Sequence, residues 1–135
     1  MLLTQFSDLA MRVLMFVAQH SNERFTIDDV NQVHNVSRGH LMKVVNTLTR
    51  AGLLNAHRGR NGGLQLARLP ESISMAEILS LTEPDFALAD CMRNSGDCPL
   101  VERCKLPNVY NEALKAFMQS LKSQTLKDVL PAEPT

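Results

Sequence analysis

The chain has 135 residues, with 14 basic and 14 acidic side chains, so its formal net charge is zero. Its 44% hydrophobic content is typical of a globular protein and excludes a wholly disordered, collagen-like or disulfide-dense chain. No apolar run approaches the roughly 18 residues that a membrane span needs, and the start of the chain lacks the features of a secretory signal. We therefore expect a cytoplasmic protein of one or two small domains.

The N-terminal part is predicted to begin with two helices, each opened by a threonine cap. Apolar side chains recur at three- and four-residue spacing from Phe6 to Val17, directly after Thr4, which is the pattern of an amphipathic helix. A second, shorter helix is expected after Thr26. Its inward-facing side chains are expected to be Ile27, Val30 and Val33.

A third helix is predicted between the cap Ser37 and Gly52, because apolar side chains again recur at helical spacing. Two short helices separated by a tight turn, the second of them basic, have the layout of a helix-turn-helix. The positions expected to read DNA are Ser37, Arg38, His40 and Lys43. His40 is alternatively a solvated surface histidine, and Arg50 is expected to contact a phosphate or the helix dipole.

A glycine-rich stretch follows and is predicted to form the tip of a small β-hairpin. Alternating leucines flank it, and glycines allow the positive φ angles of a tight turn. Beside a recognition helix such a hairpin is a wing, which can contact phosphates or a minor groove. The side chains expected to do so are Arg58, Arg60 and Asn61. A nucleotide-binding loop is the alternative, but the Lys-Ser/Thr ending of that motif is missing and no helix opens after Gly63.

The distribution of charge indicates a nucleic-acid partner. Residues 31–70 hold six basic side chains and no acid, whereas residues 71–92 hold five acids and no Lys or Arg. A neutral chain arranged in this way presents a basic surface to a polyanion and an acidic region elsewhere. Double-stranded DNA is the first partner to test, and a chance cluster of solvated charges is the alternative.

The C-terminal part is predicted to hold a short helix, a loop and a long helix. Ser74 caps the short helix, which ends before Pro84, and a polar loop with Cys91 follows. Apolar side chains from Leu106 to Leu121 then continue one stripe over four turns. So small a domain has little core against which this long apolar stripe can be buried. We therefore expect the long helix to pair with a second copy of the chain.

Three cysteines within fourteen residues are the strongest chemical signal in the chain. Cys91, Cys98 and Cys104 form an odd set, which cannot close entirely into internal disulfides. Their polar and basic neighbours favour the thiolate, which is the form that ligates metal. The paired knuckles typical of zinc sites are absent, whereas an iron-sulfur cluster accepts a non-cysteine ligand. These features favour an iron-sulfur cluster, with zinc and structural or redox thiols as alternatives.

The elements together predict a mainly α fold: a winged helix-turn-helix with a small β-hairpin wing, a cysteine-bearing loop and a long C-terminal dimerisation helix. Residues 1–70 would form the DNA-binding domain, and residues 71–135 the loop and the dimerisation helix. A thiol enzyme is the rival class, with Cys98 as nucleophile and His20 or His57 as base. Nothing at recognisable spacing supplies an oxyanion site or a third orienting group, so we expect no enzyme activity.

Nearly the whole chain resembles the Rrf2 family of bacterial winged-helix regulators, and within it the nitric-oxide-sensing repressors. The resemblance rests on the combination of wing and cysteine triplet, since each piece alone is weakly specific. Besides the three cysteines, the matching segments are residues 3–8 (LTQFSD), 36–46 (VSRGHLMKVVN), 48–52 (LTRAG), 58–64 (RGRNGGL) and 125–130 (TLKDVL).

The resemblance implies a homodimer that binds a palindromic operator and holds an iron-sulfur cluster, either 4Fe-4S or 2Fe-2S. Cys91, Cys98 and Cys104 of one subunit would hold the cluster, and Asp8 of the partner subunit would complete it. Nitric oxide would be the signal that damages the cluster. Asp8 is alternatively one half of an ordinary ion pair with Arg12, worth about 0.3 kcal/mol, and the two roles are compatible.

Two other branches of the family are the alternatives for the signal. The iron-sulfur biogenesis regulators carry a histidine shortly after the third cysteine, and this chain has Lys105-Leu106-Pro107-Asn108 there, which weakens that interpretation. The iron-responsive regulators have a cysteine loop of similar length. An iron- or redox-responsive regulator therefore stays open beside a sensor of nitric oxide.

Overall fold

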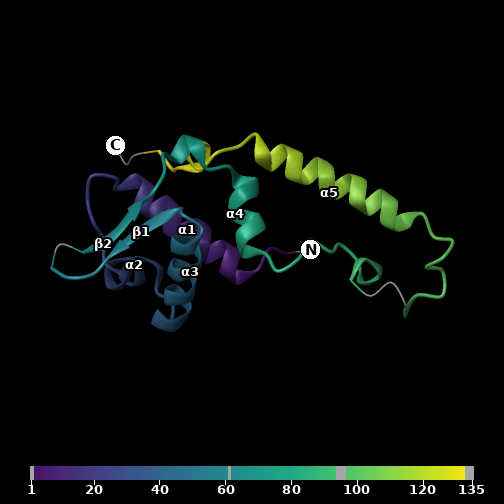
Figure 1. The fold of residues 1–135 in the computed structure, drawn as a ribbon, viewed down its shortest axis with the longest axis horizontal. Coiled ribbons are helices and arrows are strands. Elements are labelled where there is room, and N and C mark those ends of the chain that lie inside the picture. The colour runs from purple at the N-terminus through teal and green to yellow at the C-terminus, as the bar shows by residue number, and fades with distance from the viewer. Residues whose placement is uncertain (1, 61, 94–96, 133–135) are drawn as a thin grey trace.

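The computed structural model describes residues 2–60, 62–93 and 97–132. It is mainly helical with one antiparallel sheet of two strands, which confirms the predicted fold class. In chain order the elements are α1 (Gln5–Gln19), α2 (Ile27–His34), α3 (Arg38–Arg50), β1 (Leu54–His57), β2 (Gly63–Leu66), α4 (Met75–Thr82) and α5 (Leu106–Lys122). Short 3-10 turns lie at Pro70–Ser72, Asp90–Met92 and Lys127–Val129. Figure 1 shows α1 to α4 and the sheet as one body, from which α5 extends as an arm.

The four predicted helix caps are confirmed. At each helix start a hydroxyl oxygen accepts a hydrogen bond from the backbone N–H three residues on, which satisfies one donor that the helix leaves free. The caps and their donors are Thr4 with Ser7, Thr26 with Asp29, Ser37 with His40 and Ser74 with Glu77. The Asp29 carboxylate also accepts from the Thr26 N–H (2.9 Å), which completes a capping box.

The core lies between α1, α3 and the elements that pack on them. α1 and α3 bury the stripes that the sequence predicts, and these include Leu9, Val13, Leu14, Val17, Leu41, Val44, Val45 and Leu48. In α2 the prediction for Val33 is wrong, because Val30 is buried while Val33 is 60% exposed. Successive helical residues turn by about 100°, so Val33 points about 60° away from Val30. The face of this short helix that contacts the core is narrow, and Val33 lies outside it.

The predicted wing is confirmed and is anchored to the body. β1 and β2 pair antiparallel, with His57 opposite Gly63 at the end next to the connecting loop. The Leu64 N–H donates to the Phe25 carbonyl (2.7 Å), so the segment before α2 also holds the hairpin. Gly63 has φ 141°, and a Cβ there would come within 3.0 Å of the Phe25 carbonyl oxygen, so glycine permits this close approach.

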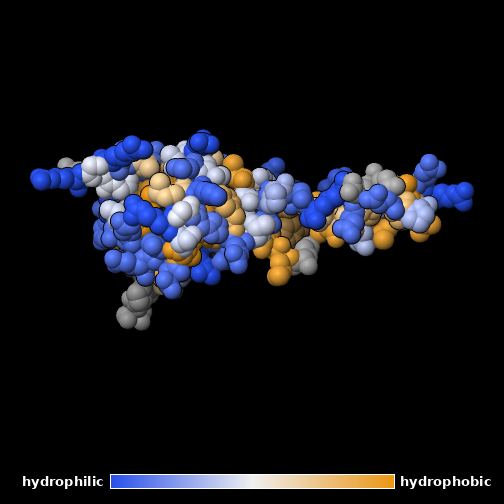
Figure 2. All heavy atoms as spheres, turned by 90° about the horizontal axis from the view of Figure 1, so that it is seen from below, coloured by the Kyte–Doolittle hydropathy of each residue, from blue (hydrophilic) through white to orange (hydrophobic). Residues whose placement is uncertain are grey.

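After α4 the chain leaves the body, and α5 brings it back. α5 has 17 residues, which makes it about 25 Å long, and none of these described residues is buried. Beyond α5, Leu126 is fully buried, and its N–H donates to the Ile73 carbonyl (2.8 Å). Figure 2 shows hydrophobic side chains in orange where the arm meets the body and along the arm.

Residues after position 70 contribute to the same core as the helix-turn-helix. Ile73, Ile78 and Leu126 belong to the buried cluster that includes α1 and α3. The division into residues 1–70 and 71–135 stays a prediction. Over the ranges that the structure describes, no helix combines the length and the apolar character that crossing a membrane requires.

Candidate functional site

The predicted DNA-reading positions lie at the start of α3. Ser37 is the N-cap, and its hydroxyl oxygen accepts from the His40 N–H (3.2 Å). The His40 ring is half-buried, with its centroid 6.1 Å from that of Phe6 in α1. Lys43 is exposed one turn further along. Lys43 is therefore free to reach a ligand, whereas Ser37 and His40 also serve the fold.

Arg38 forms an ion pair that the sequence analysis missed. Its guanidinium donates to the carboxylate of Asp28 in the first turn of α2, and both side chains are more than half exposed. A signal was present, because Asp28 lies in the helix that packs against α3 and carries the opposite charge. An exposed pair is worth roughly 0 to 1 kcal/mol, so Arg38 can exchange Asp28 for a phosphate or a base at little cost.

The other predicted cations are exposed. Arg50 ends α3, and Arg58 and Arg60 lie at the wing tip. None of the ion pairs in the described part of the chain involves these three side chains or Lys43. Their charge is thus available to a phosphate backbone. Asn61, the remaining predicted wing contact, lies outside the described residues.

Arg68, the last cation of the acid-free stretch, is used inside the fold. Its guanidinium donates to Glu77 of α4 (2.6 Å) and to the Ser72 carbonyl (2.5 Å). These bonds join the segment that leaves the wing to α4. The basic surface therefore consists of α3 and the wing tip.

The three cysteines are free, half-buried thiols on the segment between α4 and α5, residues 84–105, which we call the cysteine loop. Cys91 and Cys98 border the same hollow. Two backbone hydrogen bonds shape the turn between Cys98 and Cys104, from Val101 N–H to the Cys98 carbonyl (3.1 Å) and from Cys104 N–H to the Leu100 carbonyl (2.8 Å). The loop thus brings two of the three thiols to one surface hollow.

Asp8 lies in the first turn of α1, where its carboxylate pairs with Arg12 (3.0 Å). The predicted ion pair is confirmed, and it leaves the Asp8 side chain 61% exposed. Among described residues, no three His, Cys, Asp or Glu side chains of this single chain lie close enough to hold a metal ion. The donor chemistry still fits an iron-sulfur cluster, because three free thiols on irregular backbone supply soft ligands to iron. The ligand set stays a prediction.

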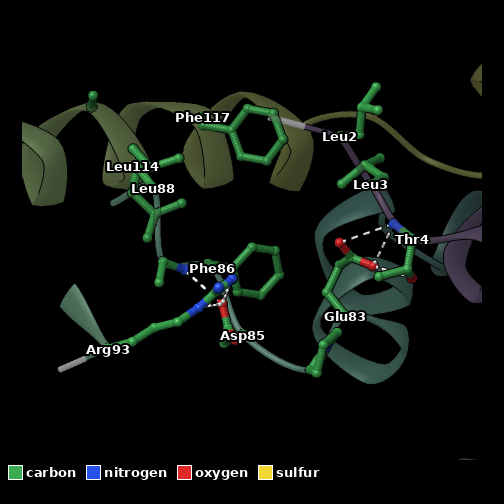
Figure 3. Close-up of a pocket in the computed structure, with 13 residues that line it drawn as sticks. Leu2, Leu3, Thr4, Glu83, Asp85, Phe86, Leu88, Arg93, Leu114 and Phe117 are labelled. Atoms are coloured by element: carbon green, nitrogen blue, oxygen red, sulfur yellow. Dashed lines mark hydrogen bonds and ion pairs between the residues drawn. The ribbon is translucent and has the colours of Figure 1, made fainter. Parts of the chain in front are cut away.

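Glu83 joins α1 to α4, and the sequence analysis missed it. Its oxygen Oε2 accepts from the Thr4 N–H (3.1 Å) and from the hydroxyls of Thr4 and Ser7 (2.5 Å each). Burial alone would raise the pKa of Glu83, but the hydrogen bonds from Ser7 and Thr4 lower it below its ordinary value. Figure 3 shows this carboxylate turned toward Thr4. Both residues line a cavity of about 450 Å³. The partners lie 76 and 79 positions away, so no local pattern reveals the contact.

His34, the last residue of α2, lies near the ion pair of Asp8 and Arg12. Its Nε2 atom is buried and has no hydrogen-bond partner in the part of the chain that the structure describes. Burial lowers the pKa of His34, and the charge of Arg12 lowers it further against the opposing effect of Asp8. The neutral form of His34 is therefore favoured, and its ring lies against Phe16 of α1, with the two ring centroids 6.0 Å apart.

Sequence comparison identifies relatives along nearly the full length of the chain. Residues 3–132 match the family described as Rrf2, Iron-dependent Transcriptional regulator. The chain is 39% identical over 132 residues to the HTH-type transcriptional regulator NsrR of Bacillus licheniformis, which covers 96% of this chain and 92% of that protein. It is 37% identical over 135 residues to Protein aau3 of Rhizobium meliloti, which covers 99% of this chain and 88% of that protein.

Solved structures share the fold. The oxidized form of Staphylococcus aureus CymR aligns with a TM-score of 0.76 and 21% identity over 100% of both chains. The T. potens IscR structure aligns with a TM-score of 0.75 and 22% identity, covering 96% of this chain and 86% of that chain. The family consists of transcriptional regulators and not of enzymes, so the thiol-enzyme alternative is dropped. Because the family match spans residues 3–132 and the relatives match over nearly their whole length, the chain belongs to the Rrf2 family of transcriptional regulators.

Proposed function

We propose that the chain is an iron-sulfur-dependent repressor that releases operator DNA when nitric oxide damages its cluster. The observation that carries the proposal is the joint presence of exposed cations on α3 and the wing and of three free cysteines on the loop before α5. The family is described as iron-dependent, and relatives named NsrR are 35% to 39% identical to this chain. We propose nitric oxide as the signal because the chain resembles the nitric-oxide-sensing repressors.

On DNA, α3 would enter the major groove and the wing would contact the backbone or the minor groove. Two copies related by a two-fold axis would place their α3 helices in successive major grooves, about 34 Å apart, which matches a palindromic operator. The proposed DNA contacts are Ser37, Arg38, His40, Lys43, Arg50, Arg58, Arg60 and Asn61.

The second copy would pack on α5. Leu106 is 46% and Val109 59% exposed, although both belong to the apolar stripe of this helix. Burying a side chain of this kind contributes about 1.5 to 3 kcal/mol, and within the described part of the chain no residue of α5 is buried. A homodimer would cover the stripe and bring the α1 helix of one copy to the cysteine loop of the other.

Cys91, Cys98 and Cys104 of one subunit and Asp8 of the partner subunit would hold the cluster. When bound, the cluster supplies an iron centre that is open to attack by nitric oxide. A carboxylate is a hard donor beside three soft thiolates, so Asp8 of the partner subunit is the ligand expected to leave first. Within its own helix Arg12 lies 3.0 Å away and is ready to take up the released carboxylate.

A change at Asp8 can reach the DNA surface through α1. Asp8 lies on the exposed side of this helix, while the buried side, with Val13 and Leu14, belongs to the core that α3 shares. A small shift of α1 would therefore displace α3, the proposed recognition helix. A coupling of about 1 to 3 kcal/mol would change DNA affinity roughly 5- to 150-fold, and a nearly complete switch would need about 5.5 kcal/mol.

An iron- or redox-responsive regulator is the second candidate, and the family description as iron-dependent favours it. An IscR-like regulator is less well supported, because residues 105–108 contain no histidine. A RirA-like iron sensor would respond to chelation of iron and not to nitric oxide. The response to these two reagents separates the candidates.

Protein purified without oxygen tests the cluster. We expect it to be brown, to contain iron and sulfide, and to bind an operator selected from random duplex DNA. Cys98→Ala should be colourless and should bind that operator weakly while keeping its helical circular dichroism. A colourless wild-type protein that holds zinc, or unchanged operator binding by Cys98→Ala, would contradict the proposal.

Mixed dimers test whether two chains supply the ligands. In a dimer of one Asp8→Ala chain and one Cys98→Ala chain, one site keeps its cysteines and receives Asp8 of the partner subunit, and the other site has lost both. We expect the mixed dimer to hold one cluster that resists a chelator, whereas the Asp8→Ala homodimer loses its clusters to the chelator faster than wild type and the Cys98→Ala homodimer holds none. A mixed dimer as unstable as the two homodimers would show that the ligands come from one chain.

A further inference from the structure

The contact between Glu83 and the start of α1 uses more hydrogen bonds than a helix end requires. The N-cap of α1 is already satisfied by Thr4, whose Oγ1 accepts from the Ser7 N–H (3.2 Å). In addition, the Glu83 carboxylate takes both hydroxyls and the Thr4 N–H, with Oε1 also 3.3 Å from that nitrogen. The Ser7 hydroxyl is fully buried and lies 2.7 Å from that of Thr82, the last residue of α4. The backbone around Ser7 is therefore fixed from two sides.

The contact of Glu83 with Thr4 and Ser7 connects the two segments that would supply ligands to the proposed cluster. Ser7 directly precedes Asp8, and Glu83 directly precedes the cysteine loop. Figure 3 shows Glu83 reaching Thr4 from the end of α4, while Asp85 pairs with Arg93 further into the loop. The Glu83 carboxylate thus links the first turn of α1, which contains Asp8, to the start of the cysteine loop.

We propose that Glu83 is a positioning residue that holds Asp8 in place for the cluster of the partner subunit. The inference rests on the proposed function, because it concerns the same site. Side chains that orient a metal ligand without touching the metal typically change metal affinity 10- to 100-fold when they are removed. The negative charge of Glu83 at the start of α1 also suits the helix dipole, but that role would stabilise the fold without involving Asp8.

In a two-fold dimer the same carboxylate links the two clusters. Asp8 of a given chain would serve the partner's cluster, while the cysteine loop of that chain holds its own. Glu83 connects Asp8 with the root of this loop within one chain.

The test measures the rate at which anaerobic dimer loses iron to a chelator, followed by its visible absorption. We expect Glu83→Ala to lose iron about 10- to 100-fold faster than wild type, and Glu83→Gln, which keeps one acceptor oxygen, to lie between them. Glu71→Gln is the matched control, because Glu71 is an exposed acid in the 3-10 turn before α4. The control should stay within about twofold of wild type. Circular dichroism establishes that each variant is folded.

Combination with Asp8→Ala separates positioning from general stability. If Glu83 acts through Asp8, Glu83→Gln adds nothing to the rate of iron loss once Asp8 has been removed. Multiplicative effects of the two changes, or a wild-type rate in Glu83→Gln and Glu83→Ala, would overturn the inference. A wild-type rate in Asp8→Ala alone would instead overturn the proposed ligand and leave the contacts of Glu83 structural.

Discussion

Removal of the two wing arginines should weaken DNA binding by removing phosphate contacts. Arg58 and Arg60 are exposed and form no ion pair within the described ranges, so no ion pair of the described protein is lost with them. Each phosphate that a protein neutralises contributes about 0.9 to the slope of log affinity against log salt concentration. A dimer carries four of these side chains, so Arg58→Gln/Arg60→Gln should lower the slope by up to about 3.6. Between about 50 and 200 mM salt, wild-type affinity should therefore fall roughly 150-fold more than that of the variant.

Fluorescence anisotropy over a series of salt concentrations measures these slopes, on the selected operator and on a duplex of unrelated sequence. Both duplexes should show the same change, because phosphate contacts carry no sequence information. Lys115→Gln/Lys122→Gln removes the same charge from α5 and should leave the slope unchanged. An unchanged slope in the wing variant, or an equal loss in the α5 variant, would refute the assignment of the wing to DNA.

Three further predictions concern stability and assembly. Leu14→Ala, at a fully buried position of α1, should lower the free energy of unfolding in urea by about 2 to 5 kcal/mol; a loss well below that range would contradict the packing of the core. The pKa of His34 lies below its ordinary value of 6.5, so the unfolded chain binds the proton more readily and stability should fall as the pH drops below 6.5. His34→Leu should remove the part of this fall that His34 causes below pH 6.5. Urea unfolding of the cluster-free protein over a series of pH values measures it, and the same dependence of stability on pH in wild type and variant would contradict the prediction. Val109→Glu should raise the dissociation constant of the dimer at least about 100-fold, because each of the two chains loses a buried valine from the interface. Analytical ultracentrifugation measures this constant, with Asn108→Glu as the control. An equally large rise in Asn108→Glu would mean that the interface lies elsewhere.

The features that the sequence predicts correctly are those whose causes are local. The caps Thr4 and Ser37 bond to backbone within three residues, and the wing follows from glycines between alternating leucines. Apolar spacing also locates the buried stripes of α1 and α3. In each case the interacting groups lie close in the chain, so residue type and spacing are enough.

The features that the sequence analysis missed depend on pairs of elements. Glu83 bonds to residues 76 and 79 positions away, and the pairing of Arg38 with Asp28 depends on how α2 lies against α3. Val33 has the right spacing for burial, but a helix of eight residues contacts its neighbours along too narrow a line. For the cysteines, spacing suggests the kind of ligand, whereas the proposed fourth ligand would come from a second chain, which the spacing within one chain does not reveal.

Titration of the anaerobic protein with nitric oxide tests the central claim most directly, when visible absorption and operator affinity are followed in the same samples. We predict that the two fall together and reach half of their change at the same ratio of nitric oxide to cluster. Full operator affinity in protein whose absorption nitric oxide has bleached would contradict the account, as would an affinity that responds only to chelation of iron.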